Sequence, residues 1–182
     1  MCSSDLIHDP HDQARLVTDV DALVRGVDEV IRTARRPMRE GAHARADLVA
    51  IVRHRTDFWS ALAEDSGRSL ALDLPTAPIP VRVSPHDLAA ALDALLENVF
   101  SHTPDGTGLR VSVGPTVAGG GTVAVEDAGP GLAATMASGR ADGSTGLGLD
   151  IARRTAQAAG GSMRKDTSPL GGALVELTFP AP

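Results

Sequence analysis

Asn98 and His102 are the first pair of residues in this sequence whose types and spacing suggest chemistry. They lie one helical turn apart in residues 84–102, where leucines at helical spacing predict an amphipathic helix. The pair therefore shares one helix face. A carboxamide beside an apolar stripe needs a polar partner, and its oxygen is a hard ligand of the kind that Mg²⁺ takes. Taken alone, Asn98 is better explained by a hydrogen bond to nearby backbone.

Asp127 is the second candidate, in the run Glu126-Asp127-Ala128-Gly129-Pro130-Gly131 at the end of an expected strand. The two glycines let the chain turn sharply and approach a ligand closely. A carboxylate at such a strand end can accept a hydrogen bond from an exocyclic amine, such as that of adenine. An ordinary acid-rich turn is an equally good explanation of this run by itself.

Residues 143–149 form the third candidate, a glycine-rich entry into a helix expected over residues 146–159. Converging backbone N–H groups and the dipole at a helix N-terminus favour phosphate. The run is not a P-loop, because no Gly-Lys-Ser/Thr follows at the required spacing. It is not a dinucleotide fingerprint either, because Ile151 stands where a third glycine would be. Close helix packing alone is the alternative explanation.

The three runs together, in this order, resemble the catalytic and ATP-binding domain of sensor histidine kinases. That domain belongs to a wider family with gyrase, the heat-shock chaperone ATPases and the mismatch-repair ATPases. Asn98 matches the family's N box, residues 127–131 its first glycine box and residues 143–149 its second. The resemblance spans roughly residues 47–179. It implies an α/β sandwich, in which helices cover one face of a mixed sheet, with a dimerisation helix before it.

The resemblance also implies a role for each candidate residue. Asn98 is the catalytic residue and binds Mg²⁺ between the ATP phosphates, with His102 beside it. Asp127 reads the adenine amino group. The remaining nucleotide-binding residues shape the adenine pocket or contact the phosphates under a lid over residues 132–145: Gly129, Gly131, Thr145, Gly146, Leu147 and Gly148.

Three departures from the family pattern bear on activity. Ala94 stands four residues before Asn98, where hydrolytic relatives carry a water-activating Glu, which disfavours a free ATPase. Ser101 occupies a position at which many kinases carry Lys, and His102 is either a partial replacement or a surface histidine. No Phe occurs between Phe100 and Phe179, so the usual phenylalanine box of the lid is missing.

Residues 13–37 carry apolar residues at alternating steps of four and three, which predicts a helix with a heptad seam. By the resemblance this is the second helix of a dimerisation and phosphotransfer hairpin. We expect an artificial or disordered start over residues 1–12, a linker over 38–46 and the catalytic domain over 47–182. The family's acceptor pattern is absent around His8 and His11, so the acceptor is expected on a parent or partner chain.

Periodicity, caps and turn residues predict the elements of the catalytic domain. Two helices are expected after Asp47 and Ser84, and a third over residues 146–159. The expected strands cover residues 70–74, 81–83, 109–113, 122–126, 162–165 and 173–179.

Composition excludes several classes of protein. The 182 residues are 42% hydrophobic with a net charge of -6, which allows a core and disfavours nucleic-acid binding. Cys2 is the only cysteine, so a disulfide within the chain and a cysteine metal cluster are both excluded. No apolar run is long enough to span a membrane. We expect a cytoplasmic location for this chain and, by resemblance, a parent anchored in the inner membrane.

The function expected is transfer of the ATP γ-phosphate to a histidine in a bacterial two-component system, with a response regulator as the next recipient. The expected assembly is a homodimer formed through the N-terminal helix. Two alternatives stay open. One is a serine kinase of the anti-sigma-factor type, against which the heptad helix argues. The other is a nucleotide-binding regulatory module without transfer activity, which the missing acceptor and Ser101 leave open.

Overall fold

The structure is a computed structural model that describes residues 44–131 and 147–182. Its helices are α2 (Leu48–Asp65), α3 (Pro85–His102) and α5 (Leu147–Ala158). Its strands are β1 (Ala46–Asp47), β2 (Leu70–Asp73), β3 (Pro80–Val81), β4 (Leu109–Pro115), β5 (Gly121–Asp127), β6 (Ser162–Thr167) and β7 (Ala173–Phe179). The heptad helix predicted over residues 13–37, most of the linker and the lid over 132–145 lie outside the described residues.

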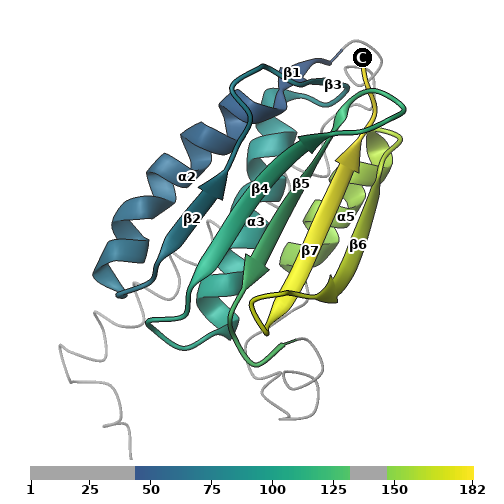
Figure 1. Cartoon of the computed structure of the whole chain (residues 1–182). Coiled ribbons are helices and arrows are strands. Elements are labelled where there is room, and N and C mark those ends of the chain that lie inside the picture. The colour runs from purple at the N-terminus through teal and green to yellow at the C-terminus, as the bar shows by residue number, and fades with distance from the viewer. Residues whose placement is uncertain (1–43, 132–146) are drawn as a thin grey trace, which may run out of the picture. The chain divides into compact units, whose positions relative to one another are not determined.

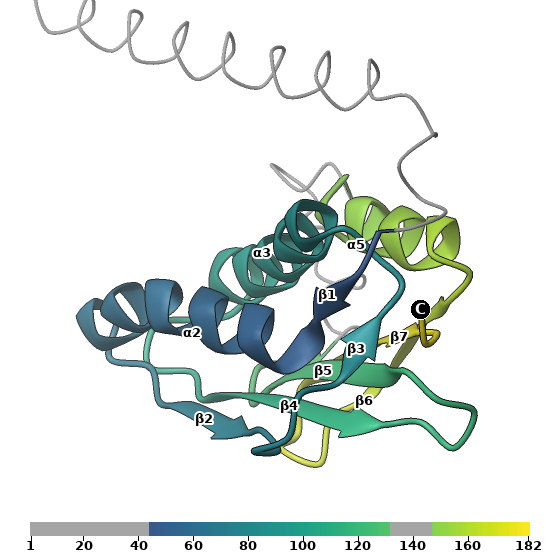
Figure 2. The ribbon, with the colours of Figure 1, turned by 90° about the horizontal axis from the view of Figure 1, so that it is seen from above.

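A five-stranded mixed sheet in the order β2-β4-β5-β7-β6 forms one layer of the domain. Strand β2 runs parallel to β4, and the other neighbours are antiparallel. Helices α2, α3 and α5 cover one face of this sheet, with α3 between the other two (Figures 1 and 2). The predicted α/β sandwich is therefore confirmed. No helix within residues 44–131 and 147–182 has the length and apolar character needed to cross a membrane.

The core lies between the sheet and the helices. Alternate residues of the central strands point toward the helices, and Val123 of β5 is paired with Val113 of β4 and Leu177 of β7. Helix α3 contributes a buried stripe made of Leu88, Leu92, Leu95, Leu96 and Val99. Because these residues recur every three or four positions, only one side of α3 is apolar, and its other side is available for polar residues.

The two predicted helix caps are present. The Asp47 side chain accepts a hydrogen bond from Val49 N at 3.0 Å, and the Ser84 hydroxyl accepts one from Asp87 N at 3.0 Å. Each cap satisfies a backbone N–H that a helix start leaves without a partner. Helix α3 ends at His102, and the next residue, Thr103, has the extended backbone that is favoured before proline.

Two short strands differ from the prediction. Ala46 lies in the predicted linker but forms β1, which pairs with β3 through Ala46 and Val81. Strand β3 ends at Val81 and not at Val83, because Arg82 N bonds Pro180 O and Val83 N turns back to Val81 O. Strands of two residues have no detectable alternation, so neither boundary could be read from the sequence.

Candidate functional site

Asp127 ends β5 on the face that the helices cover. It has the same parity as Val123 and Val125, and only 5% of it is exposed. Its Oδ1 accepts hydrogen bonds from Gly129 N at 2.8 Å and from Ala173 N at 3.2 Å. Its Oδ2 makes no hydrogen bond to any residue that the structure describes. Asp127 is thus a carboxylate held in place through one oxygen, with the other left to accept a ligand amine.

Glu126, the neighbouring acid, points to the opposite face of the sheet. Its Oε2 pairs with the Nε of Arg110 at 2.6 Å. This hydrogen bond is the largest cause that raises the pKa of Arg110 above its ordinary value. Of the two adjacent acids, only Asp127 is therefore directed toward the helices and available to a nucleotide.

The glycines around Asp127 allow unusually close backbone contacts. A Cβ on Gly129 would lie 2.6 Å from Thr103 Cγ2, and a Cβ on Gly172 would lie 2.1 Å from Asp127 Oδ1. Gly131 has a φ of +81°, a conformation that glycine adopts readily. Gly172 also donates its N–H to Asp127 O at 3.1 Å. Gly172 lies outside the three candidate runs, and the Gly171-Gly172 pair is the only local sign in the sequence of a turn before β7.

Asn98 lies on the partly exposed side of α3. Its carboxamide has no hydrogen-bond partner among residues 44–131 and 147–182, so the alternative of a bond to nearby backbone is not what the structure has. Ala94 and His102 stand one turn before and after it on the same helix face. His102 is also partly exposed. The described part of α3 thus presents an amide and an imidazole side by side.

Helix α3 carries the first candidate run and is contacted by glycines of the other two. Gly148, near the start of α5, packs on α3 so closely that a Cβ there would lie 3.4 Å from Ala94 O. Gly129 contacts Thr103 at the other end of the same stretch of α3. Asn98 therefore lies between the two contacts along the helix. Leu147 begins α5, whereas Thr145 and Gly146 lie outside the described residues.

This arrangement can bind an adenine nucleotide. It offers a buried carboxylate oxygen that can accept from a base amine, an amide oxygen further along α3, and the start of a helix, which favours negative charge. Residues 83–182 match the family model described as histidine kinase-, DNA gyrase B-, and HSP90-like ATPase. This chain belongs to that family. Its domain is the ATP-binding catalytic domain of the sensor histidine kinase type.

Similar proteins with curated names are sensor histidine kinases. The sensor histidine kinase CpxA of Escherichia coli (strain K12) is 27% identical over 189 residues, which covers 91% of this chain and 39% of CpxA. The probable sensor histidine kinase TcrY of Mycobacterium tuberculosis is 30% identical over 179 residues, which covers 87% of this chain and 36% of TcrY. This chain therefore spans well under half the length of these relatives.

Solved structures confirm the fold. The ATP-binding domain of PrrB from Mycobacterium tuberculosis aligns with a TM-score of 0.61 at 24% identity, over 77% of this chain and 98% of that one. The histidine kinase AdeS of Acinetobacter baumannii aligns with a TM-score of 0.69 at 18% identity, over 97% of this chain and 87% of that one. Both likenesses concern the arrangement of the helices and the sheet.

Proposed function

We propose that this domain binds Mg·ATP between α3, the end of β5 and the start of α5, and transfers the γ-phosphoryl group to a histidine. The observation that carries this proposal is Asp127: a buried strand-end carboxylate whose Oδ1 is held by two backbone N–H groups. Such an acid is fixed before the ligand arrives, so its Oδ2 can select an exocyclic amine at little entropic cost. A hydrogen bond from the amine to Asp127 Oδ2 would select adenine over bases that lack the amine.

Each remaining candidate has a defined task in the proposed site. Asn98 supplies an oxygen for Mg²⁺ near the phosphates, with His102 beside it on the same helix face. Gly129 and Gly131 leave room for the base. The backbone of residues 145–148 contacts the phosphates at the start of α5, where the helix dipole favours negative charge.

The residues fit a magnesium ion that is held mainly by the nucleotide. Within residues 44–131 and 147–182, no three His, Cys, Asp or Glu side chains gather to form a site made by protein alone. Mg²⁺ keeps several waters and is commonly held by one or two protein oxygens together with substrate phosphates. The carboxamide of Asn98, which has no partner among residues 44–131 and 147–182, can provide such an oxygen. When bound, the ion would neutralise phosphate charge during transfer.

The same site favours transfer to a histidine over hydrolysis. Activation of water requires a general base, and residue 94, one turn before Asn98, is a buried alanine packed against Gly148. In the proposed transfer, the lone pair of an imidazole nitrogen forms a P–N bond to the γ-phosphorus. The bond from phosphorus to the bridging oxygen breaks, and ADP leaves with its electron pair. The other imidazole nitrogen then loses its proton to solvent.

The acceptor and the later partners are proposed from the family. A phosphoacceptor helix of the parent or of a partner chain supplies the histidine, and a response regulator takes the phosphoryl group onward. We propose that the full-length protein is a homodimer anchored in the inner membrane, with this domain on the cytoplasmic side. Relatives more than twice as long as this chain are consistent with such a parent.

Titration calorimetry with Mg·ATP tests the binding step. The variant Asp127→Asn should lose affinity by about 10- to 100-fold, because a hydrogen bond to a charged acceptor contributes roughly 1.5–3 kcal/mol. Glu126→Gln is the matched control, since this adjacent acid faces the other side of the sheet and should leave the affinity unchanged. Equal behaviour of the two variants, or no heat with the wild-type protein, would refute the proposed site.

A second assay tests the transfer step. The chain is mixed with radiolabelled Mg·ATP and a separate helical hairpin that carries a sensor-kinase acceptor histidine. Acid-labile phosphate on the hairpin supports the histidine kinase. Acid-stable phosphoserine on a protein partner would instead indicate the serine kinase, and binding without transfer to any partner would indicate a regulatory module.

A further inference from the structure

Arg68 is a buried arginine that belongs to none of the three candidate runs. It lies between α2 and β2, and only 1% of its side chain is exposed. We propose that Arg68 is a positioning residue for the adenine subsite, which holds the end of α3 so that Thr103 fixes the Gly129 backbone beside Asp127. This inference rests on the proposed function, because it gives Arg68 a task in the site where adenine would bind.

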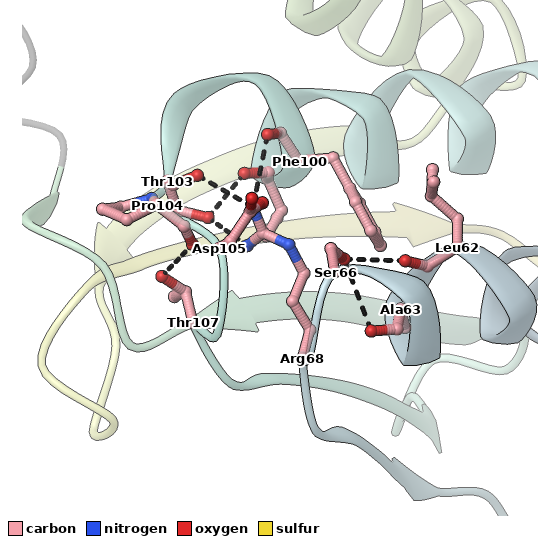
Figure 3. A network of polar contacts seen from close by, with 10 residues as sticks. Leu62, Ala63, Ser66, Arg68, Phe100, Thr103, Pro104, Asp105 and Thr107 are labelled. Carbon is pink, nitrogen blue, oxygen red and sulfur yellow. Dashed lines mark hydrogen bonds and ion pairs between the residues drawn. The ribbon is translucent and has the colours of Figure 1, made fainter.

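The guanidinium of Arg68 contacts the carboxyl end of α3 (Figure 3). Its Nη1 donates to Thr103 Oγ1 at 2.6 Å, and its Nη2 donates to Thr103 O at 2.8 Å and Phe100 O at 3.4 Å. It also lies 4.8 Å from the centre of the Phe100 ring and 3.6 Å from the exposed carboxylate of Asp105. The last carbonyls of a helix have no partners within it, so a buried cation there fixes where α3 ends.

Thr103 transmits this contact to the glycine turn. Its hydroxyl donates to Val99 O at 2.7 Å and accepts from Arg68, so both hydrogen bonds restrain the same rotamer. That rotamer directs the methyl group at Gly129, where a Cβ would lie 2.6 Å from Thr103 Cγ2. The N–H of Gly129 is one of the two donors that hold Asp127 Oδ1. A shift of Thr103 would therefore move the groups that orient Asp127.

Backbone hydrogen bonds hold the same neighbourhood together. Gly106 N donates to Ser66 O at 2.9 Å, and Leu109 N donates to Ser69 O at 2.8 Å, on either side of Arg68. Ala128 N, next to Asp127, donates to Gly108 O at 2.9 Å. The segment that carries Arg68 is thus linked in two steps to the backbone beside Asp127, independently of the side-chain path.

Burial of this arginine also has a cost. Its Nε is buried and has no hydrogen-bond partner in the part of the chain that the structure describes. A buried cation with an unsatisfied donor loses hydration, but removing Arg68 would leave Thr103 O and Phe100 O without this donor, which also costs stability. Arg68→Met should therefore release Thr103 with some loss of stability, and selectivity between two ligands separates a positioning role from a structural one.

The test compares Mg·ATP with the Mg complex of purine riboside triphosphate, which has hydrogen in place of the adenine amine. In Arg68→Met the affinity for ATP should fall about tenfold, the loss expected when one charge-assisted hydrogen bond is misaligned, whereas the affinity for the analogue should stay unchanged. The melting temperature should be lower than that of the wild type, so both affinities are measured well below it. Thr103→Ser, which keeps the hydroxyl and removes the methyl group, should show the same selective loss.

Arg55→Met is the matched control. Arg55 also bridges α2 and α3, with its Nε 2.7 Å from Asp93 Oδ1 and its guanidinium 4.5 Å from the centre of the Phe58 ring, but it contacts neither Thr103 nor Phe100. It should leave the preference for ATP over the analogue intact. An unchanged preference in Arg68→Met, or an equal loss in Arg55→Met, would overturn the inference. If Arg68→Met does not fold, Arg68→Lys takes its place in the test. Lysine keeps the positive charge but lacks the planar guanidinium, so a smaller selective loss of affinity for ATP is expected.

A readout without nucleotide separates this inference from the proposed function. The amide resonance of Gly129 in the ligand-free protein should shift in Arg68→Met and stay in place in Arg55→Met. If the wild-type protein binds no ATP, the proposed function fails, and the Gly129 resonance still decides the link from Arg68. If ATP binds and the Gly129 resonance does not respond to Arg68→Met, the inference fails alone.

Discussion

Replacing Gly172 by alanine should weaken nucleotide binding without touching any of the three sequence motifs. The added Cβ would lie 2.1 Å from Asp127 Oδ1, 2.5 Å from Asp127 O and 2.6 Å from Gly129 N. Two of these atoms belong to backbone, so no change of rotamer can relieve the contacts. Either the turn before β7 or the Asp127 carboxylate has to move.

The size of the effect follows from these distances. Ordinary contacts begin near 3.4 Å, so the displacement needed is on the order of 1 Å, which can reduce the performance of a positioned group by up to ~100-fold. We therefore expect the Kd for Mg·ATP to rise by about 10- to 100-fold, or roughly 1.4–2.7 kcal/mol. Inserting a methyl group into a packed site should also lower the free energy of unfolding by about 1–3 kcal/mol.

Gly171→Ala is the control for the loss of stability. Gly171 has a φ of +102°, and nothing lies within 4 Å of a Cβ added there. Alanine at a positive φ costs about 1–2 kcal/mol, a penalty of similar size that leaves Asp127 undisturbed. Calorimetry with Mg·ATP and urea denaturation would be run on both variants. A folded Gly172→Ala protein with wild-type affinity, or an equal loss of affinity in Gly171→Ala, would refute the reasoning.

Three further predictions concern the elements that support the site. Ser84→Ala should lower the free energy of unfolding by about 1 kcal/mol in urea denaturation, because Asp87 N loses its cap, and should leave ATP affinity unchanged. Gly148→Ala should raise that free energy by about 0.5–1 kcal/mol, since its Cβ meets Ala94 O at an acceptable 3.4 Å and alanine favours helix; a destabilised variant would contradict this packing. The pKa of Asp150 lies below its ordinary value of 3.8, chiefly because Arg153 donates a hydrogen bond to it. The stabilising effect of Asp150 is therefore present above pH 3.8 and is lost as the pH falls through the lower folded-state pKa. Asp150→Asn should make stability less dependent on pH below about 4, which thermal melts in acidic buffers would measure.

The elements of the catalytic domain were predictable because each carries a local pattern. Alternation predicted β4, β5 and β7, and the Ser84 cap with its following proline predicted the start of α3. The same patterns placed Asp127 at a strand end and Asn98 on a helix face. These assignments need only the neighbours within one or two turns of the chain, which is the range over which periodicity and capping act.

The contacts that complete the candidate site depend on tertiary structure. Gly172 closes on Asp127 only because β5 and β7 are adjacent in the sheet, and Ala173 becomes a donor to the carboxylate for the same reason. Arg68 reaches Thr103 across 35 positions of sequence. No pattern in the sequence indicates that Arg68 is buried, because a single arginine before a strand is normally a solvated turn residue. Local sequence thus determined which groups could take part in the chemistry, whereas sheet order and helix packing decided which of them meet, because hydrogen bonds between distant segments depend on how the whole core packs.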